Sequence, residues 1–112
     1  DALSFKDRLT LECAQSIRED YLHQSAFDDV DTYSSLEKQY SMLKMILTWY
    51  EKGESALEMN INYNDIVSMK ARNQIARMKY VPENEKEEKF AQIKQALHDE
   101  YEILMEGLDE NE

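Results

Sequence analysis

Residues that interrupt helices are scarce in this sequence, which contains two glycines and one proline among 112 residues. An all-β fold needs many tight turns, and glycine and proline are the residues that most often form them. Their scarcity argues against an all-β fold and favours long helices. Hydrophobic residues make up 42% of the chain and charged residues 33%, which is typical of a folded domain rather than of a disordered segment.

The chain also lacks the cysteines of a disulfide framework and the long apolar runs of a membrane protein. Its single cysteine, Cys13, excludes an internal disulfide and fits a reducing compartment. No apolar run approaches the roughly 18 residues that a membrane span needs, and there is no signal-peptide pattern. We therefore expect a cytoplasmic protein without direct membrane contact. Because the chain begins at Asp1 rather than at Met, we expect it to be a fragment of a longer protein.

Acidic residues outnumber basic residues, and the formal net charge is −11. A chain this acidic repels phosphate backbones, so we expect no nucleic-acid partner. Residues 81–112 hold eleven acidic residues against three lysines, whereas residues 69–80 hold four basic residues and no acid. Either these two segments face each other or solvate the surface, or the basic segment docks an acidic partner.

No catalytic motif is present. The two glycines are isolated, which excludes a Gly-rich phosphate loop. His23 and His98 do not belong to a spaced set of metal ligands, and the Glu-x-x-His pattern of di-iron bundles is absent. Cys13 lies in an apolar stripe without a supporting histidine or aspartate, so we interpret it as a small core residue rather than a nucleophile. We expect no catalytic residue in this chain.

Three acidic residues close together, Asp28, Asp29 and Asp31, raise the question of a calcium loop. An EF-hand needs Gly at its sixth position and Glu at its twelfth. Counting from Asp29, those positions hold Ser34 and Tyr40, so we expect no metal site. The acidic residues instead suit the N-terminus of the helix that follows, where negative charge is favourable.

Apolar spacing and capping residues predict three long helices and two short ones. The long helices run from Phe5 to His23, from a capping box at Ser34 to Glu58, and from Pro82 in a first turn to a cap at Gly107. Two short helices, 63–68 and 71–79, follow an Asn-rich break. We predict an all-α fold, an antiparallel helical bundle that forms one domain over residues 1–112, with a frayed tail at 108–112.

Each long helix carries an apolar stripe that predicts its buried face. The stripes are Leu9, Cys13, Ala14, Ile17 and Tyr21 in the first helix, Leu36, Tyr40, Leu43, Leu47 and Tyr50 in the second, and Phe90, Ile93, Leu97, Tyr101 and Leu104 in the last. A second group, Met42, Met45, Ile46 and Trp49, widens the middle stripe, so we expect part of it to meet a third element or another protein. Gly53 is expected to weaken its helix by up to about 1 kcal/mol without ending it.

A polar loop, residues 24–33, holds Phe27 at its centre and is the most informative segment. Loops run over the surface, where an aromatic side chain more often contacts a ligand or partner than fills a core. The string SAFDDVDTYSSLEKQYSMLKMIL, which contains this Phe, resembles the C-terminal helical domain of the catalytic A subunit of archaeal and bacterial A/V-type rotary ATPases. DALSFKDRLTLECAQSIREDYL before it and QIARMKYVPEN after it resemble the same family in the same order. The resemblance covers most of the chain to about Asn84, and the last helix agrees in pattern only.

Two departures from the family lie near the loop. His23, Gln24 and Ser25 replace the Gln pair and Asn that the family usually has before Ala-Phe, and Ser34 replaces a frequent Cys. Neither change alters Ala26 or Phe27.

The resemblance implies a role in nucleotide binding. In the family, a central domain of the parent subunit binds ATP and Mg²⁺ through a phosphate loop, and the C-terminal domain closes over the adenine ring. By that correspondence Phe27 packs on adenine, with Ala26 beside it and Tyr33 nearby. The alternative is that Phe27 folds back onto the bundle. With only one wall of the pocket present, we expect no cofactor and no measurable ATP binding in this chain alone.

The resemblance also implies a mechanical role for the N-terminal residues. Asp1–Asp7 resembles the lever segment that reads DELSEED in the related ATP synthase catalytic subunit and pushes on the central rotor shaft. Leu3, Ser4, Phe5 and Lys6 are therefore predicted shaft contacts, although Ser4 and Asp7 also form a plain helix cap.

The implied partners are the nucleotide-binding domain of the same subunit, neighbouring B subunits and central-stalk subunits of the soluble ATPase head, which is peripheral to the membrane. The alternative function is a free-standing acidic adaptor that uses Trp49 and the methionines to hold a partner helix. A Gly-Lys-Thr phosphate loop encoded a few hundred residues upstream would favour the ATPase over the adaptor.

Overall fold

The computed structural model describes residues 4–22 and 36–110, and this part of the chain is helical without any strand. The α-helices are α1 (Phe5–Ser16), α3 (Leu36–Glu58), α4 (Tyr63–Val67), α5 (Lys70–Ala76) and α6 (Lys86–Glu110). A π-helical segment, η1 (Ile17–Leu22), continues α1, and two 3-10 turns, η2 (Met78–Tyr80) and η3 (Glu83–Glu85), connect α5 to α6. The prediction of an all-α fold with three long helices and two short ones is confirmed.

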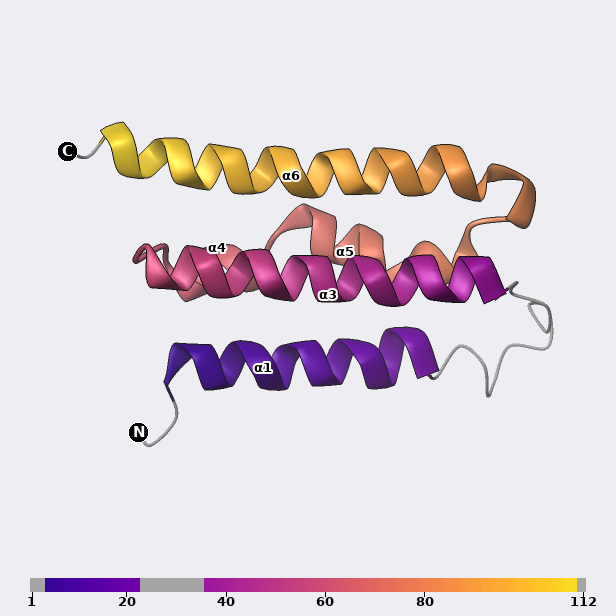
Figure 1. Cartoon of the computed structure of the whole chain (residues 1–112), viewed down its shortest axis with the longest axis horizontal. Helices are drawn as coiled ribbons and strands as arrows, with labels where there is room; N and C mark the ends of the chain where they lie inside the picture. The colour runs from indigo at the N-terminus through magenta and orange to yellow at the C-terminus, as the bar shows by residue number, and fades with distance from the viewer. Residues whose placement is uncertain (1–3, 23–35, 111–112) are drawn as a thin grey trace.

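The three long helices lie side by side (Figure 1). Their directions do not simply alternate, as they would in an up-and-down bundle. α1 and α3 run antiparallel, as predicted. α6 runs parallel to α3, because the short helices α4 and α5 carry the chain back before α6 begins. Side-chain contacts agree with this direction: Lys86 at the start of α6 pairs with Glu37 at the start of α3 (Nζ to Oε2, 3.4 Å).

The helix ends follow local capping chemistry where the sequence showed it. The hydroxyl of Ser4 accepts a hydrogen bond from the Asp7 backbone N–H at 3.1 Å and so caps α1. Asn60 adopts a left-handed backbone with φ of 68°, which Asn tolerates better than most residues, and it ends the α3 segment. The side chain of Asn62 then caps α4 by accepting from the N–H of Asn64 at 2.8 Å.

Two predicted boundaries of the last helix need correction. Pro82 precedes the 3-10 turn η3 rather than lying in the first turn of α6, which begins at Lys86. The carbonyl of Pro82 accepts the N–H of Glu85 at 2.9 Å, so the chain is already turning before the α-helix starts. The predicted cap at Gly107 is wrong: its φ is not positive, and α6 continues to Glu110.

The core lies where α1, α4, α5 and α6 meet α3. Its largest fully buried side chains include Trp49, Leu9, Met42, Ile46, Ile66, Met78 and Leu97. The predicted stripe of α6 is confirmed, since Phe90, Leu97 and Tyr101 are buried and Ile93 and Leu104 pack against them. In α1, Leu9 and Cys13 are buried as predicted, whereas Ala14 is exposed.

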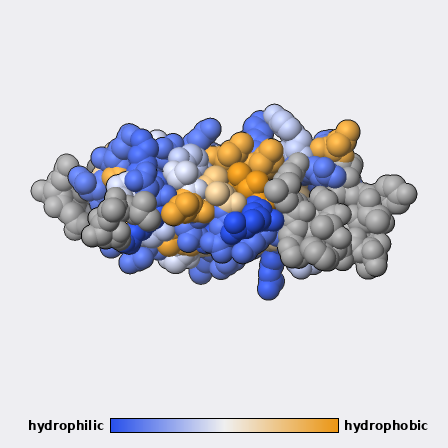
Figure 2. All heavy atoms as spheres, turned by 90° about the horizontal axis from the view of Figure 1, so that it is seen from below, coloured by the Kyte–Doolittle hydropathy of each residue, from blue (hydrophilic) through white to orange (hydrophobic). Residues whose placement is uncertain are grey.

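The predicted stripe of α3 is wrong for Leu36, Tyr40 and Leu47, which are exposed, whereas Tyr50 packs against the core. Leu36 and Tyr40 are 84% and 64% exposed, whereas the group treated as an extension of the stripe, including Met42 and Trp49, is fully buried. Two apolar stripes lie next to each other on this helix, and the core shared with α1, α4, α5 and α6 includes the one that contains Met42 and Trp49. The adaptor alternative loses its basis, because Trp49 and the methionines are occupied by the chain's own core. Apolar surface nevertheless remains among polar side chains on the α1 side of the molecule (Figure 2).

Gly53 is a point of close helix contact rather than a weak point in α3. A Cβ at this position would lie 2.9 Å from Leu9 Cδ2, 3.1 Å from Ile66 Cγ2 and 3.2 Å from the Tyr101 hydroxyl. These three side chains come from α1, α4 and α6. The missing side chain of Gly53 therefore lets three other helices approach α3 at one level.

Buried polar groups tie the connecting segments to the long helices. Lys38 is 1% exposed, and its Nζ donates to the carbonyls of Lys79 (3.1 Å) and Val81 (2.7 Å). The carboxylate of Glu100 accepts the backbone N–H groups of Lys70 (3.0 Å) and Ala71 (2.6 Å) and thereby caps α5. The acidic last helix thus faces the basic segment, as one of the two interpretations of the charge pattern predicted.

Candidate functional site

The structure describes one of the two predicted sets of functional residues. Ser4, Phe5 and Lys6 begin α1 at one end. Leu3 and the proposed adenine contacts Ala26, Phe27 and Tyr33 lie outside the described residues. The described positions that flank residues 23–35, Leu22 and Leu36, lie at the opposite end of the bundle from Phe5 (Figure 1).

The N-terminal end of α1, here called the tip, is held to the rest of the bundle by side-chain contacts. Phe5 stacks on Tyr63, the first residue of α4, with ring centroids 5.5 Å apart and an interplanar angle of 21°. Lys6 pairs with Glu54 of α3, with Nζ 3.6 Å from Oε2. The tip therefore contacts both helices that meet at the α3–α4 turn.

The exposed face of the tip is hollowed. A cavity of about 420 Å³ is bordered by Phe5 and Lys6 on one side and by the α3–α4 turn, including Asn60 and Tyr63, on the other. Phe5 remains 57% exposed even though it stacks on Tyr63. An exposed aromatic side chain such as Phe5 suits contact with another protein surface, where aromatic residues are enriched.

A second set of contacts fixes α1 along its length. Thr10 and Tyr50 join α1 to α3 through a hydroxyl pair 2.9 Å apart. Arg72 of α5 pairs with Glu12 of α1 (Nη2 to Oε2, 2.6 Å), and its guanidinium lies 5.1 Å from the centre of the Trp49 ring. Ion pairs of partly buried groups such as Arg72 and Glu12 resist displacement more than exposed pairs do.

Burial raises the pKa of two titratable side chains near these contacts. Desolvation raises the pKa of Tyr63, and the nearby charge of Glu12 raises it further. Burial raises the pKa of the Cys13 thiol, although the nearby Arg72 opposes the shift. A thiol held protonated by burial is a poor nucleophile, which agrees with the interpretation of Cys13 as a core residue.

Within residues 4–22 and 36–110, no group of three or more His, Cys, Asp or Glu side chains is arranged to hold a metal ion. No helix in this part of the chain is long and apolar enough to cross a membrane.

Comparison with known proteins decides the family. Residues 1–67 match the family described as the C-terminal domain of V and A type ATP synthase. The chain belongs to this family. The match spans the tip, residues 23–35 and all of α3 and α4, so it includes every residue that we predicted to have a functional role.

Curated relatives extend the similarity beyond α4. The V-type ATP synthase alpha chain of Acetivibrio thermocellus is 50% identical over 105 residues, which cover 94% of this chain and 18% of the relative. The corresponding chain of Thermoanaerobacter pseudethanolicus is 50% identical over 107 residues, and that of Clostridium novyi is 58% identical over 86 residues. These matches cover 96% and 76% of this chain, and 18% and 15% of the relatives. The ATP synthase domain described here thus spans less than a fifth of the length of these relatives.

Sequence reasoning missed the partners that hold the tip. Tyr63 was predicted only as the start of a short helix, and Glu54 received no role. The Asn-rich break before Tyr63 indicated a turn, but only the packed structure shows that this turn meets the start of α1.

Proposed function

We propose that this domain closes over the adenine of a nucleotide bound elsewhere in its parent alpha chain and transmits the resulting motion to a central rotor shaft. ATP and Mg²⁺ would be held by the nucleotide-binding domain of the same subunit, with neighbouring B subunits and central-stalk subunits as further partners. In this proposal the domain itself performs no catalysis. Its own residues supply one wall of the adenine pocket and a mechanical link.

The observation that supports this role most directly is the attachment of the tip to the body of the bundle. Phe5 and Lys6 are anchored on Tyr63 and Glu54, so the tip moves together with α3 and α4. α1 and η1 span 18 residues, or roughly 27 Å if the rise were that of an α-helix. A movement imposed near Leu22 would therefore displace the tip as part of the same rigid element.

The adenine contact is tested by Phe27→Ala in the assembled complex. Stacking of a base on an aromatic side chain contributes about 1–3 kcal/mol, so nucleotide affinity should fall by roughly 5- to 150-fold. Tyr80→Ala is a matched control, because Tyr80 is an exposed aromatic residue in a different part of the domain. Unchanged nucleotide affinity and ATP hydrolysis in Phe27→Ala would show that the adenine role is wrong.

The lever role is tested by cross-linking. A cysteine placed at Leu3 or Ser4 should form a disulfide with cysteines introduced on the central shaft, and the yield should vary with the bound nucleotide. Tyr80→Cys provides a control at an exposed position outside the tip. Persistent failure to cross-link from both tip positions during turnover would rule out the shaft contact while leaving the adenine role to be judged separately.

A further inference from the structure

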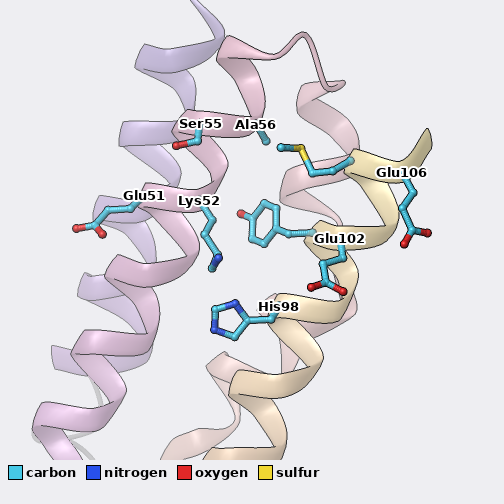
Figure 3. A pocket seen from close by; sticks show the side chains of 9 residues that line it. Glu51, Lys52, Ser55, Ala56, His98, Glu102 and Glu106 are labelled. Atoms are coloured by element: carbon cyan, nitrogen blue, oxygen red, sulfur yellow. The ribbon is translucent and has the colours of Figure 1, made fainter. Parts of the chain in front are cut away.

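A hollow of about 500 Å³ lies between α3 and α6, and it shares no lining residue with the hollow at the tip. Ala56 of α3 and Tyr101 and Met105 of α6 line its apolar part, and Figure 3 shows the labelled lining residues on the two helices. The hydroxyl of Tyr101 donates to the carbonyl of Trp49 at 2.7 Å, which holds the ring in place. The floor of the hollow therefore includes one aromatic side chain that is held by a buried hydrogen bond.

The rim of this hollow is acidic. Glu51 of α3 and Glu102 and Glu106 of α6 line the hollow, and none of the three forms an ion pair with another described residue. Figure 3 shows the carboxylates of Glu51 and Glu106 pointing outward from the two helices, on either side of the hollow. Lys52 is the one Lys or Arg among the lining residues. Burial lowers the pKa of His98 at the same site, and Lys52 and Lys94 lower it further, although Glu102 and Asp99 oppose the shift. The rim thus carries an excess of negative charge.

A second hollow of about 280 Å³ continues along the same pair of helices. Tyr40, Met45 and Phe90 contribute its apolar lining, and Lys44 and Lys94 are its charged residues. On α3, lining residues of both hollows are spaced four apart, at Lys44, Thr48 and Lys52. On α6, Lys94, His98 and Glu102 have the same spacing. Residues four apart share one face of a helix, so the two hollows lie along one side of the α3–α6 pair. Together they span residues 40–56 of α3, which is roughly 24 Å along a helix.

We propose that the two hollows form one docking groove for an amphipathic helix of a partner protein. The occupant presents apolar side chains to the groove, lysines or arginines to Glu51, Glu102 and Glu106, and acidic residues to Lys44 and Lys94. A straight groove between two parallel helices suits a helix more than an extended strand, because a helix places apolar side chains at intervals of three and four residues along one face. The opposite charges at the two ends of the groove select one orientation of the partner.

This proposal goes beyond the coupling role and does not depend on it, because the groove uses neither the tip nor residues 23–35. A second copy of this chain is a poorer occupant than a separate helix. Each copy carries a net charge of −11, and two such chains repel each other over their whole surfaces.

The experiment titrates the isotopically labelled 112-residue chain with a synthetic 18-residue helical peptide. The peptide has a leucine face, lysines in the half that meets Glu102 and glutamates in the other half. We expect chemical-shift changes confined to the groove residues of α3 and α6. Replacing the leucines by serine at constant charge should abolish binding. Equal binding of the serine peptide would show attraction by charge alone and would overturn the proposal.

A charge-reversal variant tests the orientation. The double substitution Glu102→Lys and Glu106→Lys should weaken peptide binding at least about tenfold, because like charges then face each other across the groove. The matched control, Glu85→Lys with Glu88→Lys, makes the same charge change on exposed residues of η3 and α6 that do not line the groove, and should change affinity less than twofold.

Two outcomes would contradict the proposal. Equal weakening by the groove variant and its control would show that overall charge, rather than the groove, governs binding. Concentration-dependent shifts of the groove residues without peptide, together with a dimer in sedimentation, would show that a second copy occupies the groove instead.

Discussion

Replacing Gly53 by alanine should destabilise this domain, although the same change stabilises most helices. Gly53 lies inside α3, and alanine in a helix interior is favoured over glycine by about 0.8–1 kcal/mol. The added Cβ would lie 2.9 Å from Leu9 Cδ2 and 3.2 Å from the Tyr101 hydroxyl. Leu9 has no exposed surface, and the Tyr101 hydroxyl is held by its hydrogen bond to Trp49, so neither can move aside freely.

The expected change in the free energy of unfolding is the difference between the steric cost of the added Cβ and the gain in helix propensity. Extra atoms in a packed core cost about 1–3 kcal/mol, because side chains leave their preferred rotamers or helices shift. Subtracting the gain in helix propensity leaves a loss of about 0–2 kcal/mol in the free energy of unfolding, centred near 1 kcal/mol. For a domain of this size, that loss lowers Tm by about 4 °C.

Gly107 provides a matched control within the same chain. It lies in α6, and a Cβ added there would meet no atom within 4 Å. Gly107→Ala should therefore raise the free energy of unfolding by a few tenths to about 1 kcal/mol. Urea unfolding followed by circular dichroism measures both variants. If Gly53→Ala were as stabilising as Gly107→Ala, the argument that Gly53 is needed for close helix contact would be refuted.

Three further predictions concern polar groups. Lys38→Met removes the donor for two backbone carbonyls and should lower the free energy of unfolding by about 1–3 kcal/mol, whereas Lys44→Met at an exposed position should change it by less than about 0.5 kcal/mol; equal effects in urea unfolding would contradict the role of Lys38. Glu100→Gln leaves one acceptor for two backbone N–H groups, so it should lower the free energy of unfolding by about 0.5–1.5 kcal/mol in the same assay. The control Glu102→Gln, at a residue that does not cap α5, should leave the free energy of unfolding unchanged. Burial lowers the pKa of His98 in the folded state, so on acidification the unfolded chain binds a proton at this histidine before the folded chain does. The free energy of unfolding should therefore fall as pH drops below about 6.5. An NMR titration that placed the pKa of His98 at or above about 6.5 would contradict the prediction.

Several features of the fold could be predicted because their causes are local. Ser4 and Asp7 indicated the start of α1, and the Asn-rich segment around Asn60 indicated the end of α3. Capping and left-handed turns involve residues a few positions apart, so the sequence displays both partners together. The buried stripe containing Leu97 and Tyr101 in α6 could also be predicted, because α6 carries one apolar stripe.

The candidate site was predictable only in part. The strings around Phe27 and Ser4 led to the family and to the predicted site residues, and the family match includes both strings. The contacts of Phe5 with Tyr63 and of Lys6 with Glu54 could not be predicted, because their partners are more than 40 positions apart in the sequence. No local pattern shows which turn of the chain packs against the start of α1.

The sequence by itself determined that this protein is helical, where its helices begin and end to within a few residues in most cases, and to which family it belongs. These properties depend on short-range spacing and on strings of neighbouring residues. Only the tertiary structure decided that Trp49 and Met42, rather than Leu36 and Tyr40, face the core, and that α6 runs parallel to α3. It also decided that Gly53 is a contact point and that a hollow lined by three glutamates lies beside Tyr101. Each of these results depends on which helices become neighbours in space, and burial of the larger shared apolar surface settles that choice.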